Sequence, residues 1–400
     1  MRVAGAISSN MRAHLTAISF IALFFPSYGY AHEPYSTQML RSIIARQQGI
    51  ISSGAATSTL ESGILALALE AWLDHYPPEV EPAPRFSNYL SQVLLSIDPT
   101  FVNSTSAALL PLDRLTVGQA IRHLGLRATA AESSVLATLN ASLSVQRRNQ
   151  YGGLWYYVYP EWSYLDGTVS FLPFMAADSG WSRADMLNQI MLLYSHCYDN
   201  ASGLVVHGYD ASKTAVWANP LTGASPFVWG RSLGWYLAGL VNAWEALQSN
   251  GDCDDGEDST RLQDTIAVQT SDLISALIKL PDLDTGTWWQ LPTLGGQPGN
   301  FLESSSTALF VFTILKSSRL GLLRHTEGAV HAALRAYDYA ASHFVVSNDD
   351  GTLGYNGTVS VCSLNSTASY EYYTTRPLVP DSLLGESAFV LASLEVEWMA

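Results

Sequence analysis

Two aspartates stand where a carboxyl group could do acid–base chemistry. Asp166 opens an otherwise apolar segment, and the residues just before it are rich in aromatic side chains, namely Trp155, Tyr156, Tyr157, Tyr159, Trp162 and Tyr164. Because apolar surroundings raise the pKa of a carboxylic acid, Asp166 could stay protonated and act as a general acid. Asp113 opens a second predicted helix. Each could instead serve only as a helix N-cap, and Asp113 could pair with Arg114 or Arg122.

Four further side chains could bind a sugar beside such a pair. Many sugar-cleaving enzymes use two carboxyl groups that face one cavity. Arg231 lies between Trp229 and Trp235, so its planar cation could pair with a ligand carboxylate while the indole rings contact a sugar. His207 stands in a predicted loop and could bond to a substrate or hold the loop together. No second His or Cys follows at metal-ligand spacing, so we expect no metal and no cofactor.

Two other patterns suggest different chemistry. The segment Gly230-Arg-Ser-Leu-Gly234 matches the G-x-S-x-G pattern of serine hydrolases, which makes Ser232 a candidate nucleophile. That motif needs a preceding strand and alternating strands and helices around it, whereas this chain reads as helical. Acidic residues at 252–258 could suggest calcium, but Gly256 comes one place early for an EF-hand loop and Gln263 replaces the bidentate acid. A solvated loop is favoured there.

The spacing of apolar residues predicts an all-α chain of about twelve helices. They lie near residues 38–51, 59–75, 85–95, 112–124, 130–146, 166–177, 183–197, 231–248, 261–279, 303–320, 327–344 and 385–398. Twelve paired helices can close into a ring of six inner and six outer helices, with a cavity among the loops at one end. Long loops at 150–164, 200–228, 281–300 and 349–381 separate them, and the last could include a short hairpin.

The ends and the composition of the chain indicate a secreted protein. Residues 1–31 form a predicted secretory signal peptide that is cleaved after Ala31, and residues 32–400 form one predicted domain. Five N-x-[ST] sequons, at Asn103, Asn140, Asn200, Asn356 and Asn365, agree with this route. A net charge of −15 argues against nucleic acid as a partner, and we expect a monomer with no membrane helix. The cysteines, Cys197, Cys253 and Cys362, permit one disulfide and one remaining thiol.

Several motifs in order resemble the unsaturated rhamnogalacturonyl hydrolases, glycoside hydrolase family 105, which are related to the unsaturated glucuronyl hydrolases of family 88. These motifs are Gly152-Gly-Leu-Trp155, Leu165-Asp-Gly167, Pro173-Phe-Met-Ala176, Gly203-Leu-Val-Val-His207, Trp229-Gly-Arg-Ser-Leu-Gly-Trp235, Gly299-Asn-Phe-Leu-Glu-Ser304, and Tyr372-Tyr373 with Arg376. The resemblance implies an (α/α)6 barrel of six helical hairpins with the active site in loops at one end. It makes Asp166 the catalytic acid/base and Asp113 a second catalytic aspartate. It also implies a substrate pocket formed by His207, Arg231 and Trp235, to which we add Trp155, Tyr156 and Trp229.

The chain departs from this family at three places. The family usually has His after Gly-Gly-Phe-Trp, where this chain has Tyr156. Ser232-Leu233 replaces the commoner Gly-Asn, and Ser382-Leu-Leu-Gly385 replaces a typical Asp-Pro-His-Gly. These departures affect the expected sugar preference more than the expected reaction.

The activity implied by the resemblance is the release of a 4,5-unsaturated uronic acid from the non-reducing end of oligosaccharides that lyases make from pectin or rhamnogalacturonan. Asp166 would protonate C4 of the enol ether, and water would add at C5. One alternative is an inverting glycosidase on saturated sugars with Asp113 and Asp166 as its acid/base pair. Another is a secreted carbohydrate-binding protein without catalysis.

Overall fold

The computed structural model describes residues 33–54, 57–249 and 256–399. Residues Pro34–Ala400 form one compact unit. The predicted signal peptide, most of the acidic run at 252–258 and Cys253 lie outside the described residues. Cys197 and Cys362 are both buried and are not bonded to each other.

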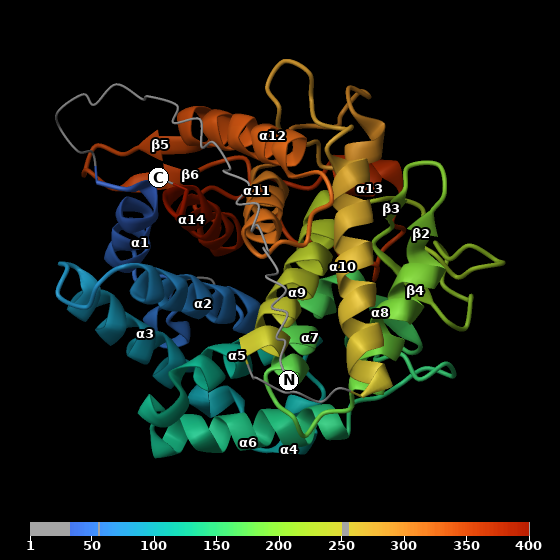
Figure 1. Cartoon of the computed structure of the whole chain (residues 1–400), viewed down its shortest axis with the longest axis horizontal. Helices are drawn as coiled ribbons and strands as arrows, with labels where there is room; N and C mark the ends of the chain where they lie inside the picture. The colour runs from blue at the N-terminus through green and yellow to red at the C-terminus, as the bar shows by residue number, and fades with distance from the viewer. Residues whose placement is uncertain (1–32, 55–56, 250–255, 400) are drawn as a thin grey trace, which may run out of the picture. The chain divides into compact units, whose positions relative to one another are not determined.

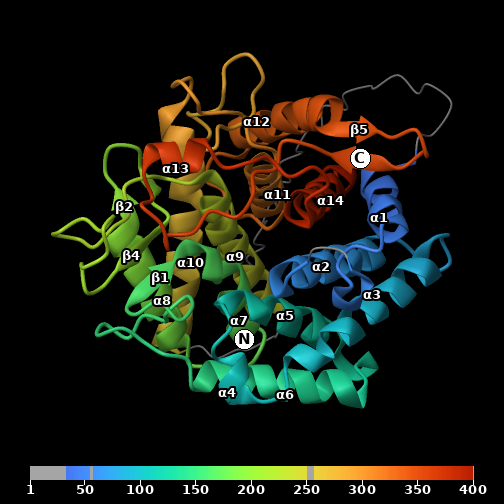
Figure 2. The ribbon, with the colours of Figure 1, turned by 180° about the vertical axis from the view of Figure 1, so that it is seen from behind.

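Six helices form a closed inner ring in which each packs on the next, and the last returns to the first (Figure 1). These are α2 (Thr59–His75), α5 (Leu115–Leu124), α7 (Thr168–Ala176), α9 (Gly230–Ser249), α11 (Ser304–Arg319) and α14 (Leu383–Glu397). Six others alternate with them along the chain and cover the ring from outside, as Figure 2 shows from behind. These are α1 (Tyr35–Ala45), α3 (Ala83–Ile97), α6 (Ala130–Ser144), α8 (Arg183–Cys197), α10 (Glu257–Leu277) and α12 (Thr326–Tyr339). The fold is an (α/α)6 barrel, and the prediction of this fold is confirmed.

Short elements fill the connections between these helices. They are the helices α4 (Ser104–Ala107) and α13 (Tyr370–Thr374), and the antiparallel strand pairs β1 (Trp162–Tyr164) with β4 (Gly208–Asp210), β2 (Tyr198–Asp199) with β3 (Leu204–Val205) and β5 (Val345–Ser347) with β6 (Leu353–Tyr355). The last pair is a hairpin that starts just before the loop in which one was predicted. Within the described part of the chain, no helix is long and apolar enough to cross a membrane.

Most residues of the inner helices are buried because an outer helix covers one face and the barrel interior the other. Every residue of α7 is buried, which explains why this segment reads as almost continuously apolar. Gly239 of α9 lies against the start of α7, where an added Cβ would come within 2.5 Å of the Thr168 carbonyl. The absence of a side chain at this position therefore lets the two inner helices approach closely.

The alternation of inner and outer helices makes all six inner helices run in the same direction. Their first residues therefore meet at one end of the barrel, and their last residues at the other end. Asp113 and Asp166 lie in single 3-10 turns, Leu112–Arg114 and Leu165–Gly167, that lead directly into α5 and α7. Both aspartates thus stand at the N-terminal end of the ring.

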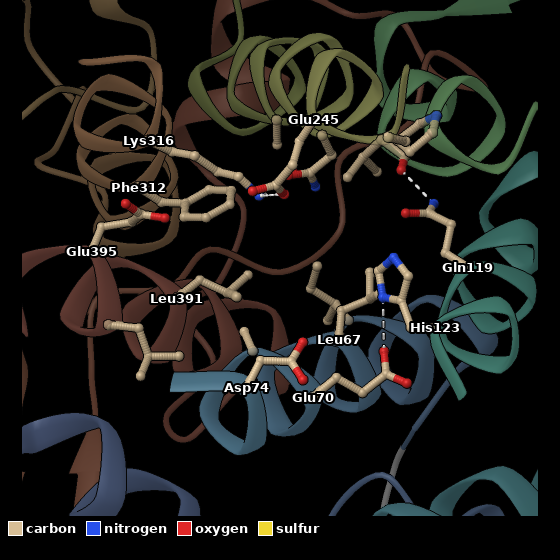
Figure 3. Close-up of a pocket in the computed structure, with 18 of the residues that line it drawn as sticks. Leu67, Glu70, Asp74, Gln119, His123, Glu245, Phe312, Lys316, Leu391 and Glu395 are labelled. Carbon is tan, nitrogen blue, oxygen red and sulfur yellow. Dashed lines mark hydrogen bonds and ion pairs between the residues drawn. The ribbon is translucent and has the colours of Figure 1, made fainter. Parts of the chain in front are cut away.

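A cavity of about 490 Å³ occupies the ring toward its other end (Figure 3). Its lining comes from the middle and C-terminal turns of the inner helices, as the labelled residues Leu67, His123, Glu245, Lys316 and Leu391 show. Neither Asp113 nor Asp166 lines it. This cavity is therefore separate from the two aspartates.

Candidate active site

Asp166 is held by a serine and approached by a histidine. The Ser232 hydroxyl donates a hydrogen bond of 2.5 Å to Oδ2 of Asp166. Nε2 of His207 lies 3.1 Å from the same oxygen, but it has no hydrogen-bond partner of acceptable geometry. The Asp166 side chain is 11% exposed, so little water reaches it. All these contacts use Oδ2, which leaves Oδ1 available to a bound molecule.

Asp113 is held by the tyrosine that replaces the family histidine. The phenol of Tyr156 donates a hydrogen bond of 2.6 Å to Oδ2 of Asp113, whereas Oδ1 is buried without a partner. Burial raises the pKa of Asp113 to about 7; the Tyr156 bond opposes this shift and the charge of Asp166 adds to it. Burial also keeps the pKa of Tyr156 well above its usual range, so the phenol remains a donor. Asp113 can therefore hold a proton under mildly acidic conditions.

His207 is buried in an aromatic cage. Its Nδ1 lies 2.7 Å from the Tyr373 hydroxyl, and its ring packs 4.7 Å from Trp229 and 5.4 Å from Tyr164. The pairing of β1 with β4 brings His207 to Asp166, because the His207 carbonyl accepts a hydrogen bond of 3.1 Å from the backbone of Leu165. The strand pair thus positions the imidazole beside the acid.

Arg231 is fully buried at the start of α9 and contacts backbone rather than open space. Its guanidinium donates to the carbonyls of Val359 at 2.5 Å and Ser360 at 2.9 Å, and it lies 4.9 Å above the Trp229 ring. Glu303 stands 3.9 Å away. These contacts tie the loop at 357–361 to the ends of the inner helices, and a role in binding a substrate carboxylate stays a prediction.

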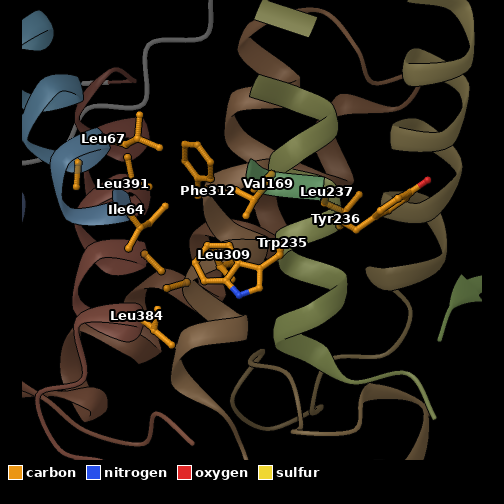
Figure 4. Packing of buried hydrophobic residues seen from close by; sticks show 14 of the residues in the cluster. Ile64, Leu67, Val169, Trp235, Tyr236, Leu237, Leu309, Phe312, Leu384 and Leu391 are labelled. Atoms are coloured by element: carbon orange, nitrogen blue, oxygen red, sulfur yellow. The ribbon is translucent and has the colours of Figure 1, made fainter. Parts of the chain in front are cut away.

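The predicted aromatic residues fall into two groups. Trp229 and Trp235 are buried, and Trp235 packs inside the barrel near Leu309 (Figure 4). Trp155 and Tyr156 are only partly buried, and the stacking of Tyr156 on Tyr164 at 4.4 Å fixes the plane of its ring. Of these four, Trp155 and Tyr156 are the ones that an incoming sugar could reach without rearrangement.

Two contacts at this site were not expected from sequence. The sequence pattern makes Ser232 a candidate nucleophile, yet Ser232 lies in the first turn of α9 and its hydroxyl donates to a carboxylate rather than to an imidazole. Glu303 stands out in the sequence only as part of a motif, yet it caps α11 and accepts the Val359 backbone N–H at 2.9 Å. The sequence signal for Ser232 was its difference from the usual Gly-Asn. Within the described residues, no group of three or more His, Cys, Asp or Glu side chains could hold a metal ion.

The chain is a barrel of six helical hairpins with two buried aspartates at the N-terminal end of its inner ring, an arrangement that would suit the cleavage of sugars. The profile of Glycosyl Hydrolase Family 88 matches residues 109–400, so this chain belongs to that family and is a glycoside hydrolase. The predicted relationship to families 88 and 105 is confirmed.

Several known proteins are similar to this chain. The 24.9 kDa protein in the picA locus of Rhizobium radiobacter and protein Atu3128 of Agrobacterium fabrum are each 32% identical over 206 residues, which cover 49% of this chain and 83% of the relative. A family 105 glycoside hydrolase from C. acetobutylicum is 26% identical, with a TM-score of 0.78 over 92% of this chain and 100% of its own. The unsaturated glucuronyl hydrolase of Bacillus sp. GL1 is 12% identical, covers 90% and 95% of the two chains at a TM-score of 0.61, and shows the shared fold alone.

Proposed function

We propose that this protein releases a 4,5-unsaturated uronic acid from the non-reducing end of oligosaccharides that polysaccharide lyases produce. The observation that carries the proposal is the pair of buried carboxyls, in which Asp166 is held by Ser232 and Asp113 by Tyr156. One proton on this pair is enough to start the reaction. The raised pKa of Asp113 keeps a proton on that carboxyl in mildly acidic solution, and the proposal requires this proton to pass to Asp166 before the first step.

The reaction begins with transfer of a proton from Asp166 to C4 of the enol ether, and an oxocarbenium ion develops at C5. Water then adds to C5 and returns a proton to the Asp166 carboxylate. The resulting hemiketal opens and releases the next sugar, so the glycosidic oxygen need not be protonated by the enzyme. His207 is buried beside Oδ2 of Asp166, so its imidazole would help to hold that carboxyl in position for the proton transfer.

The names of relatives support the substrate class. The Bacillus sp. GL1 enzyme is called an unsaturated glucuronyl hydrolase responsible for the degradation of glycosaminoglycan, and another similar fold is an unsaturated glucuronyl hydrolase specific for heparin. For the present chain we propose pectin-type substrates, secretion and action as a monomer. Four of the five sequon asparagines, Asn103, Asn200, Asn356 and Asn365, are exposed, as glycosylation would require.

Loss of ultraviolet absorbance from the conjugated enol ether tests the reaction directly. Lyase-digested rhamnogalacturonan is incubated with the wild-type chain, with Asp166→Asn and with Ser232→Ala. Bleaching by the wild type and Ser232→Ala, but not by a folded Asp166→Asn, would support hydration. If no lyase-generated uronide is bleached, including products from glucuronan, this function is rejected.

The second candidate is an inverting glycosidase, which the same pair of buried carboxyls would serve. It predicts cleavage of saturated oligosaccharides, with equal loss in Asp113→Asn and Asp166→Asn. Release of reducing sugar from a saturated substrate at a rate above that from the unsaturated one would favour this candidate. Binding of sugars without turnover, unaffected by Asp166→Asn, would favour a carbohydrate-binding protein.

A further inference from the structure

Tyr373 reaches the candidate acid through the ring of His207. The Tyr373 hydroxyl lies 2.7 Å from Nδ1 of His207, and Nε2 on the other side of the same ring lies 3.1 Å from Oδ2 of Asp166. Tyr373 and His207 are both fully buried. The phenol, the imidazole and the carboxyl group therefore form a chain of polar groups that ends at the proposed acid.

The surrounding side chains hold Tyr373 in one place. The Gln290 side chain accepts a hydrogen bond of 3.1 Å from the indole of Trp229 and donates one of 3.3 Å to the Tyr373 carbonyl. The His207 ring packs against both aromatic residues, with its centroid 4.7 Å from that of Trp229 and 5.9 Å from that of Tyr373. The phenol and the imidazole cannot turn away from each other without disrupting this close packing.

The partners of the Tyr373 hydroxyl determine the direction of its hydrogen bond with His207. Burial keeps the pKa of Tyr373 well above its usual range, so the hydroxyl carries a proton. Within the described part of the chain, this hydroxyl forms a hydrogen bond only with Nδ1, so its proton has an acceptor only when it points at that nitrogen. An imidazole that accepts a hydrogen bond at Nδ1 is neutral and carries its own proton on Nε2.

The opposite tautomer would be unfavourable on both sides of the ring. A proton on Nδ1 would leave the Tyr373 proton without an acceptor, and the lone pair of Nε2 would face Oδ2 of Asp166 at 3.1 Å. Lone pairs on nitrogen and on a carboxylate oxygen repel each other at this distance, whereas a proton on Nε2 is attracted to the oxygen. The contact is not aligned well enough for a regular hydrogen bond, so the attraction is mainly electrostatic.

We propose that Tyr373 is a positioning residue that fixes His207 in the tautomer with its proton on Nε2, and thereby directs the acidic proton of Asp166 to Oδ1. Two donors then face Oδ2, the Ser232 hydroxyl at 2.5 Å and Nε2 of His207 at 3.1 Å. An oxygen that faces two donors is a poor place for a proton, whereas Oδ1 faces no hydrogen-bond donor within the described residues. The acid would thus deliver its proton from Oδ1, a step that rests on the proposed function.

Nitrogen-15 spectra of the histidine side chains at neutral pH test the tautomer in the full chain without substrate. The signals of His207 are those that are absent from His207→Gln or, if that variant does not fold, from His207→Asn. We expect Nε2 to be protonated and Nδ1 to be unprotonated in the wild type. In Tyr373→Phe the Nδ1 signal should move further from the range of protonated nitrogens, because this nitrogen loses its donor.

Tyr372→Phe is the matched control. Tyr372 is the adjacent residue of α13, and its hydroxyl accepts a hydrogen bond of 2.8 Å from the backbone N–H of Ser363 instead of contacting the imidazole. This variant loses the same hydroxyl group from the same helix, so it should leave both nitrogen signals of His207 unchanged.

Steady-state kinetics on lyase-generated unsaturated oligosaccharides test the consequence for Asp166. In Tyr373→Phe, kcat should fall roughly tenfold to a hundredfold while KM changes less than about threefold, because the buried phenol acts on the acid and does not contact the substrate. Both constants should stay within about threefold of the wild type in Tyr372→Phe. Equal losses of kcat in the two variants would show that the Tyr373 hydroxyl only stabilises α13, and would overturn the proposal.

The spectra also decide the proposal independently of turnover. A proton on Nδ1 of His207, or on both nitrogens, in the wild type would overturn it even if Tyr373→Phe does not fold. If the wild-type chain bleaches no unsaturated uronide, the proposed function fails, whereas the spectra still show whether Tyr373 sets the tautomer of His207.

Discussion

The Ser232 hydroxyl lies 2.5 Å from Oδ2 of Asp166 and donates its proton to that oxygen. Ser232 belongs to the first turn of α9, and Asp166 to the turn before α7, so the contact joins two adjacent inner helices. A serine whose proton already points at a carboxylate is not activated by an imidazole, as nucleophilic catalysis would require. The geometry therefore makes Ser232 a positioning residue for the candidate acid.

Replacement of Ser232 separates this role from nucleophilic catalysis. In Ser232→Ala the hydrogen bond to Asp166, worth about 1.5–3 kcal/mol, is lost, so turnover should fall by roughly tenfold to a hundredfold. A catalytic nucleophile would instead lose activity on the order of a million-fold. Steady-state kinetics on unsaturated oligosaccharides make the measurement, and Ser232→Thr, which retains a hydroxyl, should recover part of the lost rate.

Tyr156 should control the charge state of Asp113. Its hydrogen bond lowers the pKa of this carboxyl, so Tyr156→Phe should raise the pKa of Asp113 by about one unit. If the protonated form of Asp113 is the active one, the alkaline limb of kcat/KM against pH should move upward from about 7. If the alkaline limb stays in place or moves to lower pH, the hydrogen bond from Tyr156 does not govern the titration of Asp113. Trp155→Phe, at the neighbouring position, is the control.

Stability should fall as the pH rises from mildly acidic to neutral. Burial raises the pKa of Glu70, Asp113 and Glu386 to about 7 in each case, above the unfolded values of 4.5, 3.8 and 4.5. Between these limits the folded state binds more protons than the unfolded state, so the free energy of unfolding falls as the pH rises. The slope is about 1.4 kcal/mol per pH unit for each fully titrating group.

Denaturant midpoints between pH 4 and pH 8 measure this slope. Glu70→Gln removes one of the three titrating groups and should flatten the curve without abolishing it. Below about pH 4 stability should fall again, because Asp178 and Asp185 have lowered pKa values and lose their ion pairs when protonated. A curve that rises steadily from pH 5 to pH 8 would contradict the raised pKa values.

The contact between α7 and α9 should not tolerate a methyl group at Gly239. In Gly239→Ala the new Cβ would meet the Thr168 carbonyl at 2.5 Å, so we expect a loss of about 1–3 kcal/mol in the free energy of unfolding. Gly328→Ala in α12 is the matched control because nothing lies within 4 Å of its added Cβ. Helix propensity should make that change neutral or stabilising by up to about 1 kcal/mol. Equal effects at both positions would show that the helices can separate slightly at no cost.

Local periodicity made most of the fold predictable. Each of the twelve predicted segments overlaps one of the twelve barrel helices, because the spacing of apolar residues reflects which face of a helix is buried. The boundaries were less accurate. The segment predicted from 166 becomes a helix only at Thr168, since residues Leu165–Gly167 form a tighter turn that sets Asp166 before the helix.

The sequence by itself determined the helices, the two aspartates at helix starts and the relationship to the family. Each of these features depends only on residues that are near one another in the chain or on motifs that follow in a fixed order. Only the tertiary structure decided which distant side chains meet. Ser232 reaches Asp166 across 66 positions, and Arg231 reaches Val359 across 128. It also placed Trp235 inside the barrel and left Glu70 facing a second cavity. The physical reason is that these contacts form only when the ring of helices closes. The local spacing of apolar residues predicts which face of each helix is buried, but it does not determine how six hairpins pack around one axis.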